Sequence, residues 1–313
     1  MTTALLTHPA CLNHEPPPGH PESPARLAAV LEALSDPEFG ALARLEAPAA
    51  ARSALIGAHA AQQVARLLDE WAPLTGTHRY VRVDPDTAMS AGSAEAALRA
   101  AGACVRAVDE VMGGRSRNAF CAVRPPGHHA ERARAMGFCL FNSIAVAAHH
   151  ARVAHGCKRV AIVDFDVHHG NGTQDIFWND PDTLYASTHE FPYYPGTGAA
   201  DERGASGNIV NVPLPAGAGS EAFRTAYRDV ILPAVEQFRP DFLFISAGFD
   251  AHAADPLADL RLTEADFSWI TRELCAVAAR CCDGRVVSTL EGGYDLDALA
   301  ASAAAHVRAL MEA

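Results

Sequence analysis

Short, predominantly apolar segments recur along the chain and constrain its fold more than any other feature of the sequence. They have the length of strands and cover residues 4–7, 119–123, 160–166, 184–187, 209–212, 242–246 and 286–290. Strands that are apolar throughout, rather than alternating, are typical of a parallel sheet covered on both faces. Longer helical segments lie between them, at residues 93–112, 142–155, 220–238 and 263–282. This alternation predicts an α/β fold with a mostly parallel sheet.

The composition is that of an ordinary globular protein. The 313 residues are 49% hydrophobic and 20% charged, which is enough apolar material for a sizeable core. No repeat or low-complexity linker divides the chain, so we expect residues 1–313 to form a single catalytic domain. The proline-rich segment 14–24 is predicted to be a loop, and it lies too near the N-terminus to separate two domains.

Charge and cysteine usage limit the classes of partner. The net charge of −12 argues against a general nucleic-acid binder and is compatible with cationic substrates. No apolar run reaches the length that spans a membrane. The eight cysteines include no C-x-x-C pair, and the N-terminus carries no basic and apolar leader. We therefore expect a reducing, cytoplasmic location, with neither nucleic acid nor a membrane as partner.

The segment 160–168 reads Val-Ala-Ile-Val-Asp-Phe-Asp-Val-His and carries the strongest chemical signal. Because side chains alternate along a strand, Asp164, Asp166 and His168 are predicted to share one face at its end. Two carboxylates on one face are costly to bury without a cation. The alternative is that the acids cap a turn and His168 packs in the core, but capping needs only one carboxylate. An Asp/His/Asp set instead suits zinc.

A second apolar strand also ends at an acid, in the segment Ser246-Ala-Gly-Phe-Asp250. Gly248 permits close backbone approach just before this acid. An isolated aspartate at a strand end is more often a helix N-cap. In combination with the first motif, Asp250 is predicted to be the third metal ligand, whereas His252 is expected to be a loop residue.

Two further motifs supply groups for acid–base chemistry. Pro125 and Pro126 end a strand, and the turn after them presents His128 and His129, whose side chains titrate in the range that a base and an acid require. The alternative is a pair of surface loop histidines. In the segment 290–294, two glycines allow a close turn that projects Tyr294, whose phenol can stabilise an oxyanion; the alternative is that Tyr294 only packs.

Aromatic loops lie at residues 136–142 and 189–198. An aromatic pair drawn from these two loops could grip an extended apolar stem. Core packing explains each loop equally well when it is taken separately.

All of these stretches, in this order, resemble the zinc-dependent histone deacetylase family, and within it the class II and bacterial histone deacetylase-like amidohydrolases. The motifs are HPESPAR at 20–26, RPPGHH at 124–129, DFDVHHGNGTQ at 164–174, SAGFDAH at 246–252 and EGGY at 291–294. The resemblance implies a three-layer arginase/deacetylase-like fold, in which helices flank a central, mostly parallel sheet of about eight strands.

The resemblance also implies a role for each site residue. The zinc ligands are Asp166, His168 and Asp250, with one zinc per chain. The catalytic group comprises His129 as general base and acid, His128 as its electrostatic partner, Asp164 orienting His128, Asn171 facing His129, and Tyr294 at the oxyanion. The acyl-lysine tunnel is lined by Gly137, Phe138, Tyr194 and Leu257. Structural potassium is implied at Asp164, Asp166, His168, Ser187 and Thr188.

The expected function is a zinc-dependent deacetylase that hydrolyses the amide of N-acyl (acetyl) lysine in proteins or peptides. An acetylpolyamine amidohydrolase is the alternative, although Leu257 stands where polyamine-selective relatives have an acid. An arginase-like enzyme with two metals would want carboxylates where Gly170 and His252 stand. A binding module without activity would not need the histidine pair or Tyr294. Acyl-chain length and oligomeric state stay open.

Overall fold

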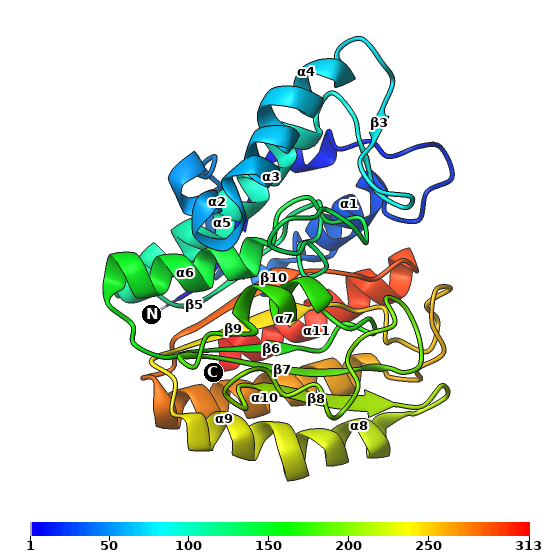
Figure 1. Cartoon of the computed structure of the whole chain (residues 1–313). Coiled ribbons are helices and arrows are strands. Elements are labelled where there is room, and N and C mark those ends of the chain that lie inside the picture. The colour runs from blue at the N-terminus through cyan, green and yellow to red at the C-terminus, as the bar shows by residue number, and fades with distance from the viewer. Residues whose placement is uncertain (1) are drawn as a thin grey trace.

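The computed structural model describes residues 2–313 and has three layers, with a sheet between two sets of helices (Figure 1). Within that range the central sheet has eight strands in the order β2-β1-β5-β10-β9-β6-β7-β8, and all neighbouring strands are parallel. Its strands are β1 Thr2–Thr7, β2 Ala43–Glu46, β5 Ser116–Cys121, β6 Val160–Asp164, β7 Thr183–Glu190, β8 Ile209–Leu214, β9 Phe242–Ala247 and β10 Val286–Leu290. The predicted α/β fold with about eight parallel strands is confirmed.

Helices cover both faces of this sheet. On one face α5 packs against α6, and on the other α10 packs against α11, which also contacts α1 (Figure 1). The α-helices are α1 Pro24–Ala33, α2 Arg52–Ala58, α3 Ala61–Ala65, α4 Ala72–Thr75, α5 Ser93–Met112, α6 Ser143–His155, α7 Asn171–Phe177, α8 Ser220–Ala226, α9 Leu232–Phe238, α10 Glu264–Cys281 and α11 Leu296–Glu312. A π-helical turn, Tyr227–Ile231, joins α8 to α9, so the helix predicted over 220–238 is continuous. None of the helices within residues 2–313 is long and apolar enough to cross a membrane.

Short elements complete the chain. A small antiparallel pair, β3 Val81–Arg82 and β4 Ala88–Met89, lies outside the main sheet. Another π-helical turn, Arg66–Trp71, joins α3 to α4. The 3-10 turns are Pro9–Leu12 and Pro37–Phe39.

The edge strand β2 was not predicted from the sequence. This strand pairs with β1 on one side, and its residues alternate between half-buried and exposed. Because β2 is only four residues long and includes Arg44 and Glu46, it forms no apolar run of the kind that predicted the other strands. Helix boundaries were predicted more closely, since α5 spans 93–112 and α10 begins with a capping box between Thr263 and Asp266.

The predicted strand 160–166 was too long, because β6 ends at Asp164. At that point the side chain of Asp164 accepts a hydrogen bond from the backbone N–H of Asp166, at 3.1 Å. This local bond competes with the sheet ladder and turns the chain. The strand predicted at 119–123 likewise ends early, at Cys121, and Ala122 and Val123 continue as buried loop toward Pro125.

The N-terminal loop is anchored by a buried ionic group. Residues 14–23 form no helix or strand, as predicted, yet Glu22 in this loop is fully buried. Its carboxylate accepts hydrogen bonds from Arg124 at 2.5 and 2.7 Å and from Arg26 at 3.1 Å. Although burial alone would raise the pKa of Glu22, the Arg124 guanidinium holds it well below the usual value. Since Arg124 begins the loop that carries His128, Glu22 ties the N-terminal segment to this loop.

Substituting Glu22→Gln should therefore destabilise the fold strongly. The amide would leave two buried guanidinium groups without a counter-charge, and breaking a buried pair in this way costs about 3–5 kcal/mol. Glu38→Gln, which removes an exposed partner of Arg308, should change stability little. Urea unfolding followed by circular dichroism measures both free energies, and equal values for the two variants would contradict the prediction.

Candidate active site

The chemistry-bearing residues gather beyond the carboxyl ends of five neighbouring strands. In the order of the sheet these strands are β5, β10, β9, β6 and β7. Ligands in open α/β sheets bind at this edge. Loops that are far apart in the sequence therefore meet over the middle of the sheet.

The loop after β6 keeps an alternating pattern although the strand has ended. The side chain of Asp164 accepts from the N–H of Asp166, and that of Asp166 accepts from the N–H of His168, at 3.1 and 2.9 Å. These successive turns direct Phe165 and Val167 into the core. The predicted shared face of the three polar residues is thus kept by side chain to backbone bonds rather than by a strand.

Asp166, His168 and Asp250 form one buried group of potential metal ligands. The Nδ1 atom of His168 lies 3.1 Å from Asp166 Oδ1 and 3.2 Å from Asp250 Oδ2. Both aspartates are fully buried, and His168 is 8% exposed. The remaining oxygens accept backbone N–H groups, Asp166 Oδ2 from Gly292 at 2.8 Å and Asp250 Oδ1 from Val167 at 2.9 Å. These bonds aim one oxygen of each aspartate at His168.

The electrostatics of this group call for positive charge. Burial and the neighbouring Asp166 raise the pKa of Asp250. Although burial opposes it, hydrogen bonding to Asp166 and Asp250 raises the pKa of His168 to about 10. Two buried carboxylates so close together are stable only beside a proton or a cation. A divalent ion held by these three side chains would supply that charge.

His128 and His129 lie next to this group, with ring centroids 4.0 Å apart. The Nδ1 atom of His128 donates to Asp164 Oδ2 at 3.1 Å. Although burial opposes it, Asp166, Asp164 and Glu291 hold the pKa of His128 well above the usual value. These acids therefore favour the positively charged form of His128.

The pKa of His129 is shifted in the opposite direction from that of His128. Burial, together with the charges of His128 and His168, holds the pKa of His129 well below the usual value. Its Nδ1 lies 2.8 Å from Asn171 Oδ1, and the amide nitrogen of Asn171 donates to Glu131 at 2.8 Å. Because a carboxylate only accepts, this second bond determines which way the amide points. The amide oxygen must then accept from Nδ1 of His129, which leaves Nε2 with the free lone pair.

Glu291 was not singled out as a site residue by the sequence, yet it shapes the histidine loop. Its Oε2 accepts from the backbone N–H groups of Gly127 and His128 at 2.6 and 3.1 Å, and its Oε1 accepts from Ser246. Burial raises the pKa of Glu291 to about 7, against the opposing charge of His128. The only sequence signal was its place in the EGGY motif.

A narrow cavity of about 100 Å³ opens onto these groups. It is lined by Gly137, Phe138, Tyr194 and Leu257, together with Asp86, His129, His168 and Tyr294. The four residues predicted for the tunnel thus share one cavity with the candidate base and a candidate ligand. A larger hollow of about 670 Å³ lies near Met112 and Arg285 but contains none of these groups.

Asp86 bonds to residues in the wall of the cavity, and this role was not predicted from the sequence. Its carboxylate accepts from the Tyr194 hydroxyl at 2.9 Å and from the Gly137 N–H at 3.0 Å. Gly137 has a φ of 58°, and a side chain there would collide with the ring of His129 at 2.4 Å. Phe138 also has a positive φ, of 67°. Asp86 lies in an irregular loop without a motif, so no sequence pattern marks it.

Tyr294 enters the cavity from the loop after β10. Its backbone N–H donates to Asp255 at 2.7 Å, and the guanidinium of Arg26 lies over its ring, 4.7 Å from the centroid. Arg26 is itself held by the carbonyl oxygens of Gly293 and Glu291. The buried ionic group of Glu22, Arg124 and Arg26 therefore reaches the aromatic ring of Tyr294.

Two of the residues predicted for potassium, Ser187 and Thr188, lie on β7. Ser187 on β7 pairs in register with Asp164 on β6, and both are fully buried. The Thr188 hydroxyl donates to Tyr227 at 3.3 Å. His252 lies apart from the metal group, because its Nε2 is 3.6 Å from Glu264 and its Nδ1 accepts from a loop N–H.

Comparisons with known proteins show the family to which this chain is similar. The Histone deacetylase domain family matches residues 20–310. A probable deacetylase from Archaeoglobus fulgidus is 39% identical over 95% of this chain and 82% of its own length. The histone deacetylase-like amidohydrolase of Pseudomonas aeruginosa is 40% identical over 88% of this chain and 73% of its own. Histone deacetylase 14, chloroplastic, from Arabidopsis thaliana is 46% identical over 68% of this chain. The matched part covers 52% of that relative's own length.

The crystal structure of the HDA15 HD domain superposes with a TM-score of 0.91 at 39% identity, covering 99% of this chain and 88% of that one. The fold is therefore shared along nearly the full length of the chain. The chain belongs to the histone deacetylase family, whose members are hydrolases acting on amides.

Proposed function

We propose that this chain is a metal-dependent deacetylase that hydrolyses the amide of N-acetyl-lysine in proteins or peptides, releasing a free amine and acetate. The observation that carries the proposal is that a neutral His129, with its Nε2 lone pair free, lines the same narrow cavity as His168 and Tyr294. A base, a candidate metal ligand and a phenol that share one small cavity suit hydrolysis of a small acyl group.

Zinc fits the group formed by Asp166, His168 and Asp250. Asp250 Oδ2 is buried and accepts no well-aligned hydrogen bond within the described residues, because His168 Nδ1, 3.2 Å away, is directed at Asp166 instead. Gly292 leaves room beside this oxygen, since a Cβ at that position would lie 1.9 Å from it. Bound there, zinc would polarise the acyl carbonyl and lower the pKa of a water molecule.

The residues of the chain would divide the proton chemistry. His129 takes a proton at Nε2 while water attacks the carbonyl carbon, because its Nδ1 is already committed to Asn171. His128, charged and hydrogen-bonded to Asp164, stabilises the growing negative charge. Tyr294 donates its hydroxyl proton in a hydrogen bond to the oxyanion. His129 then returns the proton to the leaving amine.

Substrate binding would use the walls of the cavity. Phe138 and Tyr194 contact the apolar stem of the lysine, Gly137 leaves room for it, and Leu257 borders the entrance. The cavity volume of about 100 Å³ suits one extended chain rather than a bulky group. A panel of acetyl-lysine peptides, longer acyl-lysines and acetylpolyamines, compared by kcat/KM, tests the proposal, and no hydrolysis of any of them would refute it.

Potassium would bind through backbone oxygens around Asp164 and Ser187, because both oxygens of the Asp164 side chain already accept hydrogen bonds. We also infer that residues 1–313 act as one catalytic domain. Eight free cysteines are compatible with a reducing compartment such as the cytoplasm.

Removing Asp250 should remove the metal from the cavity. Asp250→Ala deletes one of three ligands and should lower the zinc content of the purified protein by about one equivalent. The matched control is Asp259→Ala, which removes an exposed aspartate from the same loop. Elemental analysis distinguishes the two, and an unchanged zinc content in Asp250→Ala would refute the assignment.

Tyr294→Phe tests the oxyanion contact. Because this hydrogen bond forms mainly in the transition state, kcat should fall by about 10²–10³ while KM changes little. Tyr193→Phe is the control, since the Tyr193 hydroxyl donates to the carbonyl of Leu257 rather than into the cavity. A near-normal kcat for Tyr294→Phe in steady-state kinetics would mean that the ring only packs.

Leu257→Glu tests substrate class. The wild type should favour acetyl-lysine peptides over acetylpolyamines, and a carboxylate at this position should shift kcat/KM toward polyamines by pairing with a distant ammonium. Leu257→Gln separates charge from polarity, and added salt should weaken the shift. If the wild type already preferred acetylpolyamines tenfold, the acetylpolyamine amidohydrolase would become the favoured function.

A further inference from the structure

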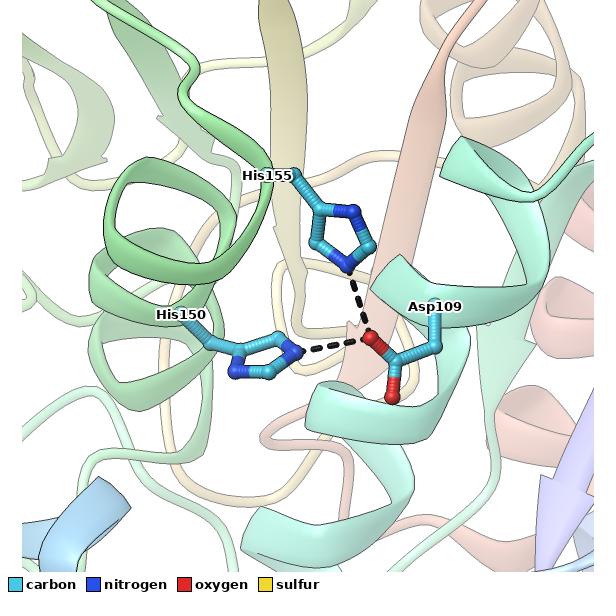
Figure 2. Close-up of side chains that lie close together, drawn as sticks. All are labelled: Asp109, His150 and His155. Carbon is cyan, nitrogen blue, oxygen red and sulfur yellow. Dashed lines mark hydrogen bonds and ion pairs between the residues drawn. The ribbon is translucent and has the colours of Figure 1, made fainter.

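A second group of potential metal ligands lies between helices α5 and α6, outside the candidate active site. Figure 2 shows His150 and His155, both on α6, pointing toward one carboxylate oxygen of Asp109 on α5. Their Nε2 atoms lie 2.8 and 2.7 Å from Asp109 Oδ1. We propose that these three side chains bind a divalent transition-metal ion of the zinc class and so clamp α5 to α6.

The donor set and its geometry suit zinc. Two imidazole nitrogens and one carboxylate oxygen are ligands that zinc accepts, and water can complete the shell. Bonds of about 2.0–2.1 Å in a tetrahedron separate the ligand atoms by about 3.4 Å, so each histidine–aspartate contact would open by about 0.6 Å. Small side-chain rotations suffice, because His150, His155 and Asp109 are 21%, 25% and 37% exposed.

The position of Asp109 favours a cation. It lies in the last turn of α5, at the negative end of the helix dipole. That turn, wholly within residues 2–313, holds no basic residue. The neighbouring Glu110 is paired with Arg106 and Arg115, whereas the carboxylate of Asp109 is bonded to the two histidines. His155 is the last residue of α6, so the C-terminal ends of both helices meet here.

The location indicates a structural rather than a catalytic role. The C-terminal ends of α5 and α6 lead into the first residues of β5 and β6, which puts the cluster at the amino edge of the sheet. The candidate active site lies at the opposite, carboxyl edge. An ion between α5 and α6 would therefore stabilise the helix layer without contacting substrate.

A calorimetric titration tests the proposal. Zinc is added to the tag-free chain after its metal has been removed, and the number of equivalents bound is measured. The wild type should bind two equivalents, Asp250→Ala should keep the one between α5 and α6, and His155→Ala and Asp109→Asn should each keep the one in the cavity. Losing an outer partner of a ligand already costs about 10–100-fold in affinity, so losing a ligand should cost at least as much. His149→Ala, a histidine of α6 outside the cluster, is the control and should bind two equivalents.

Thermal unfolding gives a second readout that does not depend on activity. Zinc beyond the first equivalent should raise the unfolding temperature of the wild type but not of His155→Ala. The proposal is overturned if the wild type binds one equivalent only, or if His155→Ala and Asp109→Asn bind as the wild type does. Either result would mean that the two histidines simply donate hydrogen bonds to Asp109.

Discussion

Buried negative charge at the carboxyl edge of the sheet is the constraint on which the rest of the structure depends. Asp164, Asp166, Asp250 and Glu291 are all buried beyond the ends of adjacent strands. Carboxylates in such a place are stable only when hydrogen bonds and positive charge surround them. Backbone N–H groups and the neighbouring His128 satisfy part of this need, and the group around His168 needs further positive charge, for which we proposed a metal ion.

The same acids also hold the loops in place. Glu291 binds the backbone of the loop that carries His128, and Asp166 binds the loop after β10. Glu22 bonds to Arg124 and so joins the N-terminal segment to the loop that carries His128. Because each carboxylate bonds a loop from a different strand, charge neutralisation and loop position are coupled. A loop that moved would leave a buried charge without its partner.

The two adjacent histidines show how position alone separates chemical roles. His128 faces the carboxylate of Asp164, whereas His129 faces the amide oxygen of Asn171. A carboxylate favours the imidazolium, and a neutral amide does not compensate for burial. The surroundings therefore favour the charged form of one ring and the neutral form of its neighbour, which is the difference that our proposed mechanism needs.

The sequence by itself determined the fold class, most of the strands, and the metal and histidine motifs, because apolar runs and alternating acids are local patterns. It missed β2, whose short, half-exposed edge carries no apolar run, and it extended β6 past Asp164, where a side-chain bond turns the chain. Only the tertiary structure decided the roles of Asp86 and Glu291, since their partners come from distant loops. The same holds for Asp109 and His155, which lie 46 residues apart and meet only because two helices pack side by side on one face of the sheet.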